Sequence, residues 1–349
     1  MEAAVWYGEK DIRVEERELK EMNENEIKVK VAWAGICGSD LHEYEEGPVF
    51  VPAYHSDPLT GQQAPLTMGH EFSGIIEEVG AKVRNFKPGD RVAINPTITR
   101  GIKSSKYDIY DGFSFLGLHS DGGFADYAIV PESNVYTLPA SLTLQDGALI
   151  EPAAVAVQAL KEADLAIGNS IAVFGVGPIG LLTILAAKAA GATTIIALDL
   201  SETRLEKAQT VGATHVVNSK NMDPIKAIKE ITTEGVDIAF EVAGVEQTFK
   251  QSIQSTKARG RMVVVSIFAT SIDWNPMELT TTGVNVTSSL AYESSTFQQT
   301  IDLMAAGQLN PQKVITDIIP LYRIVDRGFE VLSSDKSHAK ILVELSGEM

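Results

Sequence analysis

The stretch GICGSDLH at residues 35–42 holds the side chains best suited to chemistry. It contains Cys37, the one cysteine among 349 residues, with Ser39 two positions later and His42 five positions later. A lone cysteine cannot form an intramolecular disulfide. Cys37 is therefore a buried small side chain, a reactive thiol or a metal ligand, and its residue type alone does not choose among the three.

Two further segments carry side chains that could bind a metal ion. MGHEFSG contains His70 and Glu71, and LIEPAAVA contains Glu151. His70 could instead be a hydrogen-bonded core histidine, and Glu151 could simply favour a helix N-terminus beside Pro152. Both segments are apolar, however, and an unpaired carboxylate is costly to bury. A cation would remove that cost, and a Cys, a His and a carboxylate together suit a catalytic zinc ion with one open position.

A glycine-rich turn predicts a nucleotide site. FGVGPIG supplies Gly175, Gly177 and Gly180 in G-x-G-x-x-G spacing, after an apolar strand and at the start of a helix. These glycines permit a tight turn, approach of the backbone to a pyrophosphate and close packing of helix on strand. The helix N-terminus offers free N–H groups to the phosphates.

Asp199, nineteen residues beyond the last of these glycines, indicates which cofactor would bind. Its carboxylate can accept hydrogen bonds from both ribose hydroxyls of an adenosine and would repel a 2′-phosphate, which favours NAD over NADP. Arg204 could accommodate such a phosphate or lie along the ribose. The alternative is a structural turn with a helix-capping Asp199. The predicted cofactor-binding residues are Gly175, Val176, Gly177, Pro178, Ile179, Gly180, Asp199 and Arg204.

The elements that must position these residues fall into two patterns. Up to about residue 150, short alternating runs such as EIKVKVAWA and FADYAIV are separated by KPGD and DGG, which indicates an antiparallel, barrel-like β domain. From about residue 170, apolar strands alternate with helices expected over 178–190, 202–210, 223–233 and 246–256, with VNVTSSLAY as a closing strand. That order is typical of a doubly wound parallel sheet, so the fold class is α/β.

The charge balance excludes several classes of partner. Asp and Glu number 46 against 29 Lys and Arg, giving a net charge of −17, which argues against nucleic acid and anionic membranes. The N-terminal MEAAVWYGEKDIRVEERE lacks the basic start and apolar run of a signal peptide. Glycines and Pro178 interrupt the apolar run 171–187, which favours strand–turn–helix over a membrane span. We expect a soluble, cytoplasmic protein.

The whole chain resembles the zinc-dependent medium-chain dehydrogenases. The motifs that carry the resemblance are AGICGSDLHEY, GHEFSGIIEEVG, KPGDRV, GGFADYAIVP, EPAAVA and VFGVGPIGLL. The resemblance implies a GroES-like β-barrel catalytic domain over 1–153 and 290–349, with a Rossmann NAD-binding domain over 154–289. In that arrangement the segment SSTFQQTIDLMAAG forms a helix, and AKILVEL forms a strand that returns to the first domain.

The resemblance also assigns roles at the site. Catalytic zinc would be held by Cys37, His70 and Glu151, with Glu71 either a ligand in some states or a close neighbour of the ligands. Asp40 matches the carboxylate that orients the metal-binding histidine.

Two further residues match the proton relay of the family. The hydroxyl proton would pass from Ser39 through the cofactor ribose to His42 at the surface. Without the resemblance, Ser39 is equally a turn or cap residue and His42 a surface histidine. The remaining histidines, among which His119 is the one of interest, are expected on the surface or in loops.

One departure from the family is informative. Many members hold a second, structural zinc with four cysteines in the lobe after the GDRV strand, but here INPTITRGIKSSKYDIYDGFSFLGLHSDGG contains no cysteine. We therefore expect one catalytic zinc per chain, no structural zinc, and a lobe held by packing and hydrogen bonds.

Three stretches most resemble those of family members that interconvert 2,3-butanediol and acetoin: GICGSDLHEYEEGP, SFLGLHSDGGFADY and AFEVAGVEQTFKQSIQST. The expected substrate is thus a small vicinal diol or its hydroxyketone, including diacetyl. Sorbitol-type polyol and L-threonine dehydrogenases are close alternatives. A metal-free NADPH quinone reductase and a nicotinamide-binding sensor without catalysis are the more distant ones. The resemblance further implies a homodimer or homotetramer, with VNVTSSLAY as the candidate edge.

Overall fold

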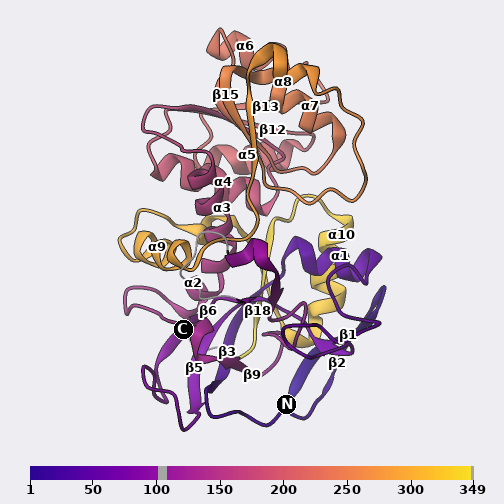
Figure 1. The fold of residues 1–349 in the computed structure, drawn as a ribbon, viewed down its shortest axis with the longest axis vertical. Coiled ribbons are helices and arrows are strands. Elements are labelled where there is room, and N and C mark those ends of the chain that lie inside the picture. Colours follow the sequence, from indigo (N-terminus) through magenta and orange to yellow (C-terminus); the bar gives the residue numbers. More distant parts are fainter. Residues whose placement is uncertain (101–107, 347–349) are drawn as a thin grey trace. The chain divides into compact units, whose positions relative to one another are not determined.

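A computed structural model describes residues 1–100 and 108–346 and divides into two compact units (Figure 1). Unit 1 contains Met1–Glu151, Glu293–Ala306 and Ile315–Met349, and unit 2 contains Pro152–Tyr292 and Gly307–Val314. The chain therefore leaves unit 1 twice, for residues 152–292 and again for residues 307–314, and returns to it after each.

Unit 1 is built mainly from short strands. Its strands are β1 (Glu2–Gly8), β2 (Asp11–Glu16), β3 (Glu26–Gly35), β4 (Leu66–Thr67), β5 (Glu71–Val79), β6 (Arg91–Ile94), β7 (Thr97–Thr99), β8 (Phe113–Phe115), β9 (Tyr127–Pro131), β10 (Val135–Thr137), β17 (Ile315–Pro320) and β18 (Lys340–Glu344). Its helices are α1 (Gly38–Glu46), α2 (Leu144–Ala148), the start of α3 (Ile150–Glu162), α9 (Ser294–Ala305) and α10 (Glu330–Ser334).

The largest sheet of unit 1 has seven strands in the order β10-β6-β5-β3-β18-β17, with β9 also paired to β3. β5 lies antiparallel along one edge of β3. The other edge of β3 is shared: β9 pairs with residues 26–30, and β18 pairs with residues 33–35. The strand AKILVEL thus returns to the first domain, as predicted, and lies beside the end of β3 that leads into Cys37.

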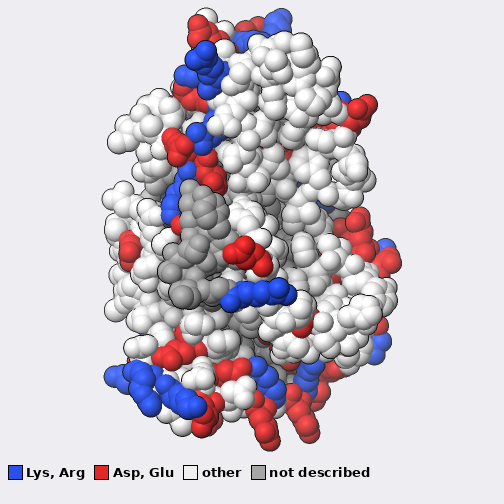
Figure 2. Space-filling view, viewed as in Figure 1, with Lys and Arg blue, Asp and Glu red and all other residues white. Residues whose placement is uncertain are grey.

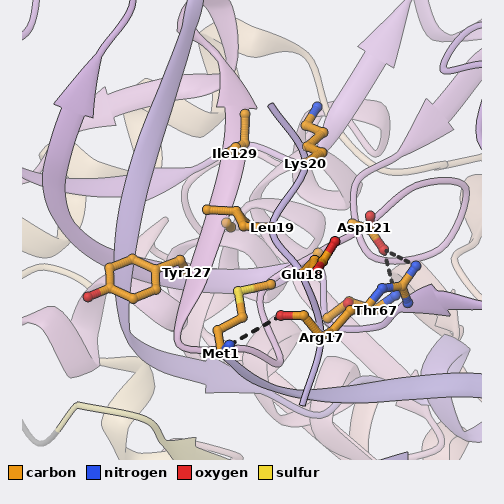
Figure 3. Close-up of a pocket in the computed structure, with 11 residues that line it drawn as sticks. Met1, Arg17, Glu18, Leu19, Lys20, Thr67, Asp121, Tyr127 and Ile129 are labelled. Atoms are coloured by element: carbon orange, nitrogen blue, oxygen red, sulfur yellow. Dashed lines mark hydrogen bonds and ion pairs between the residues drawn. The ribbon is translucent and has the colours of Figure 1, made fainter. Parts of the chain in front are cut away.

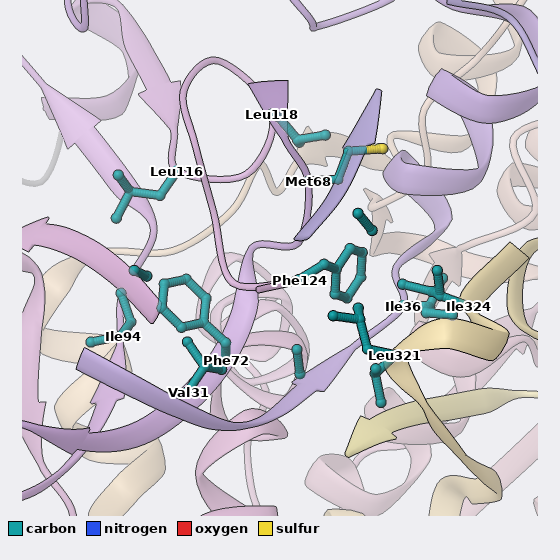
Figure 4. Close-up of a cluster of buried hydrophobic side chains, with 14 of the residues drawn as sticks. Val31, Ile36, Met68, Phe72, Ile94, Leu116, Leu118, Phe124, Leu321 and Ile324 are labelled. Atoms are coloured by element: carbon teal, nitrogen blue, oxygen red, sulfur yellow. The ribbon is translucent and has the colours of Figure 1, made fainter. Parts of the chain in front are cut away.

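A continuous apolar core supports this sheet (Figure 4). Among its members, Ile36 directly precedes Cys37, Phe72 directly follows Glu71, and Met68 lies two residues before His70. All three are at most 1% exposed. Because close-packed interiors resist displacement, the backbone around the candidate site is anchored on both sides by core side chains.

Unit 2 is a six-stranded parallel sheet in the order β13-β12-β11-β14-β15-β16. The strands are β11 (Ser170–Phe174), β12 (Thr194–Asp199), β13 (His215–Asn218), β14 (Val236–Glu241), β15 (Thr256–Val264) and β16 (Asn285–Ser288). The helices are α4 (Pro178–Ala189), α5 (Glu202–Val211), α6 (Pro224–Thr232), α7 (Glu246–Ser255) and α8 (Met277–Thr282). Four consecutive residues of β11 are buried, which shows that both faces of the sheet are covered. The predicted doubly wound fold is confirmed.

No described helix is both long and apolar enough to cross a membrane. The run 171–187 forms β11, a turn and most of α4, as predicted. On the face drawn in Figure 2, basic side chains stand beside acidic ones. Ion pairs of this kind among the described residues include Arg323 with Asp326 at 2.6 Å and Arg327 with Asp317 at 2.7 Å.

Residues 101–107 of the cysteine-free lobe lie outside the described part of the chain. Hydrogen bonds connect the described part of the lobe to its surroundings. β7 pairs with β8, and the hydroxyl of Ser114 donates to both carboxylate oxygens of Asp57 at 2.9 Å. The hydroxyl of Thr60 donates to the carbonyl of His119 at 2.9 Å. The loop that contains Asp57 and Thr60 thus holds the lobe through two separate points.

His119 lies in a turn of this lobe, as predicted, and its side chain is partly buried. Its ring lies 6.2–6.3 Å from the rings of Phe50, Phe113 and Phe115, and its Nδ1 accepts the backbone N–H of Phe115 at 3.0 Å. Burial lowers the pKa of His119, against an opposing effect of the Asp57 charge. A protonated Nδ1 could not accept the Phe115 N–H, so the folded lobe requires neutral His119.

The stability of the protein should therefore fall as the pH drops through the ordinary histidine pKa of about 6.5. The unfolded chain gains a proton there that folded His119 resists, and the loss continues down to the lowered pKa of the folded state. In His119→Asn the side-chain oxygen can still accept the Phe115 N–H but does not titrate. Thermal unfolding midpoints between pH 7.5 and 5.5 should fall less in this variant. Equal slopes in both proteins would contradict the assignment.

Candidate metal centre and cofactor site

Strand pairing brings the predicted metal ligands together. β3 and β5 are antiparallel, with Gly35 opposite Glu71. Cys37 follows the end of β3 and His70 precedes β5, so both lie at the same edge of the sheet. One potential ligand atom from each of Cys37, His70 and Glu71 lies within 4.8 Å of the others. Among the described residues this is the only such group of three Cys, His, Asp or Glu side chains.

Helix α1 supplies the neighbours of His70. Nδ1 of His70 lies 3.3 Å from a carboxylate oxygen of Asp40, and neither atom has another hydrogen-bond partner within the described chain. The second oxygen of Asp40 accepts the backbone N–H of Cys37 at 2.9 Å. Asp40 thus binds the backbone of one candidate ligand and faces the ring of the other. This geometry leaves Nε2 of His70, 3.4 Å from the Ser39 hydroxyl, as the atom available to a metal.

The charges around His70 favour a bound cation. Burial alone would lower the pKa of the imidazole, but the charges of Asp40 and Cys37, with hydrogen bonds to both, raise it well above its ordinary value. Without a metal, a proton on His70 balances this negative surrounding. A divalent ion supplies the same balance while requiring the neutral imidazole, so metal binding would release a proton.

Removing the Asp40 charge should weaken the metal site without dismantling it. In Asp40→Asn the contact with Nδ1 loses its charge, and we expect zinc affinity to fall about 10- to 100-fold. Competition with a chromogenic chelator gives that number directly. Glu46→Gln, an exposed change on the same helix, is the matched control and should keep the wild-type affinity. Unchanged affinity in Asp40→Asn would remove Asp40 from the site.

Glu71 is fully buried and is balanced by Lys340, the first residue of β18. The ammonium of Lys340, 1% exposed, donates to both carboxylate oxygens at 2.7 Å and to the carbonyl of Ile36 at 2.9 Å. A Cβ at Gly35 would come within 2.0 Å of the Glu71 carboxylate, so only glycine fits opposite it. The Lys340 ammonium thus holds the Glu71 carboxylate beside Cys37 and His70.

Glu151 does not belong to the group of three within 4.8 Å. It is buried in the first turn of α3. The charge of Glu151 affects the pKa of Lys340. Burial would lower the pKa of that ammonium, but the charges of Glu71, then Cys37 and Glu151, together with the bond to Glu71, raise it. The charges of two carboxylates therefore act on one lysine beside the candidate site, and the ligand role of Glu151 stays a prediction.

His42 lies three residues after Ser39 on α1, and both are partly exposed. Residues three apart share one helix face, which is the placement that a short relay needs. Asp40 and Glu43, in contrast, are fully buried on this helix.

Sequence reasoning missed Lys340. The only local signal is a lysine at the start of an otherwise apolar strand, which is usually a solvated strand end. Its partner Glu71 lies 269 residues earlier in the chain. No spacing rule connects the two, so their contact follows only from the pairing of β18 with β3.

The glycine-rich turn of unit 2 has the geometry that a phosphate site requires. Gly175 has φ +91°, a conformation that side-chain-bearing residues rarely adopt. A Cβ on Gly180 would lie 2.1 Å from the carbonyl of Gly175, which shows the close approach of α4 to β11. Nothing lies within 4 Å of a Cβ built at Gly177, and no side chain caps α4 there. The helix N-terminus is therefore open to a phosphate group.

Asp199 ends β12 beside this turn, as predicted. One carboxylate oxygen accepts the backbone N–H of Val176 at 2.9 Å, and the other accepts those of Leu200 and Ser201. Arg204 lies 4.0 Å from Asp199. The carboxylate is thus fixed next to the glycine turn, where the ribose of an adenosine would lie, with a guanidinium close to it.

A small cavity elsewhere in unit 1 is not part of the site (Figure 3). Its volume of about 20 Å³ has room for one water molecule. Arg17 crosses its rim, with its guanidinium donating to the carbonyl of Pro65 and lying 3.6 Å from Asp121. None of the candidate catalytic or metal-binding residues lines it.

Two family models match the chain. The alcohol dehydrogenase GroES-like domain covers residues 23–140, and the zinc-binding dehydrogenase domain covers residues 178–306. Together with the relatives below, they show that the chain belongs to the zinc-binding, medium-chain alcohol dehydrogenase family, oxidoreductases that act on CH–OH groups. The predicted family and the predicted enzyme class are confirmed.

Individual relatives cover nearly all of the chain. The (R,R)-butanediol dehydrogenase of Bacillus subtilis is 44% identical over 344 residues, which are 98% of this chain and 99% of the relative. The sorbitol dehydrogenase of Bacillus subtilis is 33% identical and spans 98% and 97% of the two chains. A crystal structure of 2R,3R-butanediol dehydrogenase from Bacillus subtilis superposes with a TM-score of 0.94 at 43% identity, over 98% and 99% of the two chains.

Proposed function

We propose that this enzyme is a zinc- and NAD(H)-dependent dehydrogenase that interconverts 2,3-butanediol and acetoin and also reduces diacetyl. The observation that carries the proposal is that ligand atoms of Cys37 and His70 lie within 4.8 Å of each other, with the Glu71 carboxylate equally close and Asp40 behind the histidine. The near-full-length similarity to a butanediol dehydrogenase supports a small vicinal diol as the substrate.

The chain's own residues would divide the work as follows. Cys37 and His70, with one carboxylate, would hold zinc, which as a Lewis acid lowers the pKa of the substrate hydroxyl. Asp40 keeps the His70 ring in the orientation that presents Nε2. Ser39, beside Nε2, would take up the hydroxyl proton, which would pass through the cofactor ribose to His42 and from there to solvent.

Which carboxylate completes the metal site can be tested by paired substitutions. We propose that Glu151 is the third ligand, because Lys340 already occupies both oxygens of Glu71. Glu151→Gln should then lower zinc affinity more than Glu71→Gln does, measured by chelator competition on the purified proteins. The opposite order would make Glu71 the ligand and leave Glu151 as a second balancing charge for Lys340.

Asp199 supports NAD as the cofactor, since it would repel a 2′-phosphate. Arg204 at 4.0 Å is the one nearby group that works in the other direction. Comparison of kcat/KM for NADH and NADPH in acetoin reduction tests the preference. Asp199→Ala should bring the two kcat/KM values closer together, because it removes the repulsion between the carboxylate and the 2′-phosphate.

The deciding experiment combines metal analysis with activity. About one zinc per chain, together with NAD-dependent oxidation of (R,R)-2,3-butanediol, would support the proposal. Two zinc ions per chain would contradict the absence of a structural site. No zinc, with NADPH-dependent quinone reduction, would favour the metal-free alternative. Because a sorbitol dehydrogenase is 33% identical, sorbitol and L-threonine belong in the same assay, and faster turnover of sorbitol would make this a polyol dehydrogenase.

A further inference from the structure

Glu241 is a buried carboxylate that no step of the proposed reaction uses. It ends β14 and is 0% exposed. Its Oε1 accepts hydrogen bonds from the backbone N–H groups of Ala243 at 3.0 Å and Gly244 at 2.9 Å, and from the hydroxyl of Thr248 at 2.7 Å. Its Oε2 accepts the hydroxyl of Ser266. A buried charge that satisfies four donors is an organised feature of the fold.

Three of the four partners of Glu241 belong to two turns at the same edge of the sheet, and the fourth, Thr248, lies in α7. The β14 turn (residues 242–245) leads into α7, and the β15 turn (residues 265–268) follows β15. A Cβ on Gly244 would lie 2.5 Å from the carbonyl of Ile267, so the two turns are in close contact. The backbone N–H of Ser266 also reaches the carbonyl of Glu241 at 3.3 Å. The carboxylate therefore fastens both turns to one strand end.

These turns lie where a dinucleotide would bind. The strand order reverses between β11 and β14, and ligands of such sheets occupy the crevice at the carboxyl ends of the strands on either side of that point. The β14 turn also abuts the glycine-rich turn, because a Cβ on Gly175 would lie 2.9 Å from the side chain of Ala243. The turn fastened by Glu241 thus forms one side of the crevice.

The two halves of the sheet would bind different halves of the cofactor. Asp199 on β12 and the glycine turn after β11 belong to the half that receives the adenosine, which leaves the β14 and β15 turns for the nicotinamide half. Both turns expose an apolar side chain, Val245 at 51% and Ile267 at 47%. A flat, uncharged dihydronicotinamide ring is suited to such a surface.

We propose that Glu241 is a positioning residue for the nicotinamide half of the cofactor, acting through the two turns that it holds. This inference rests on the proposed use of NAD(H). Glu241 need not contact the cofactor, because its three hydrogen bonds to the turns set the places of the backbone segments that would.

Calorimetric titration with NADH and with ADP-ribose, which lacks the nicotinamide, separates this role from general support of the fold. In Glu241→Gln the shape is kept while the charge that holds the turns is lost. We expect NADH affinity to fall about tenfold. ADP-ribose affinity should change less than about twofold, because the glycine turn and Asp199 remain in place. Asp199→Ala should show a different pattern, in which the affinities for NADH and for ADP-ribose fall together.

Two milder variants keep the test sharp if Glu241→Gln folds poorly. Ser266→Ala removes the side-chain hydrogen bond between the β15 turn and Glu241 and should also reduce NADH affinity selectively. Gln254→Ala, an exposed change near the end of α7, removes no hydrogen bond from either turn and should bind NADH like the wild type. If the affinities for NADH and ADP-ribose fell in parallel, or if NADH affinity did not fall, the inference would be overturned. A wild-type protein that binds neither ligand would overturn the proposed function itself.

Discussion

Replacing Lys340 with methionine is expected to lower the free energy of unfolding of the metal-free protein by about 3–5 kcal/mol. Methionine fills a similar volume, but it leaves the fully buried carboxylate of Glu71 without the ammonium that now donates to both of its oxygens. Urea unfolding in the presence of a chelator measures the loss, because bound zinc would otherwise compensate part of the unpaired negative charge.

The double variant Lys340→Met with Glu71→Gln is the matched control. Removing both charges of a buried pair costs much less than removing one, so the double variant should be more stable than Lys340→Met alone. If the two losses simply added, Lys340 and Glu71 would not be the coupled pair that their 2.7 Å contacts indicate.

Cys37→Ser should abolish stable zinc binding and the associated turnover. A serine hydroxyl stays protonated at neutral pH and is a far weaker zinc ligand than a thiolate. We expect kcat/KM to fall by more than the roughly 100-fold that loss of an outer partner of a metal ligand costs. Zinc content by atomic emission and initial rates on the diol provide the two readouts.

Ser39→Ala on the same segment distinguishes metal loss from relay loss. It should retain about one zinc per chain while slowing the reaction, since it removes only the hydroxyl beside Nε2 of His70. A Cys37→Ser protein that still binds one zinc tightly would place the metal elsewhere and remove the basis of the proposed mechanism.

Local sequence patterns were sufficient to predict the helices and strands of the nucleotide-binding unit. The helix expected over 178–190 is α4 (Pro178–Ala189), and the one expected over 202–210 is α5 (Glu202–Val211). Apolar strands, glycine spacing and helix starts are all encoded within about 20 neighbouring residues, so they can be recognised without knowing the remaining fold.

The residues of the candidate metal centre could be predicted only in part from local sequence patterns. The motifs around Cys37 and His70 identified two side chains that the structure brings together, and Asp40 was recognised through the same motif. Lys340 and the hydrogen bonds of Glu241 could not be foreseen, because each depends on which strands become neighbours. The choice between Glu71 and Glu151 depends on a few ångströms of side-chain placement, which no sequence pattern reports.

The pairing of β18 with the last residues of β3 has a consequence for biogenesis. Ile36 and Lys340 meet across 304 residues, so the charge-balanced centre is complete only after translation has passed β18. A nascent chain can offer Cys37 and His70 early, but Glu71 then lacks its counter-ion. Metal capture by this protein should accordingly be a late event that follows the docking of the returning strand, and internal deletions that remove β18 should yield chains poor in zinc.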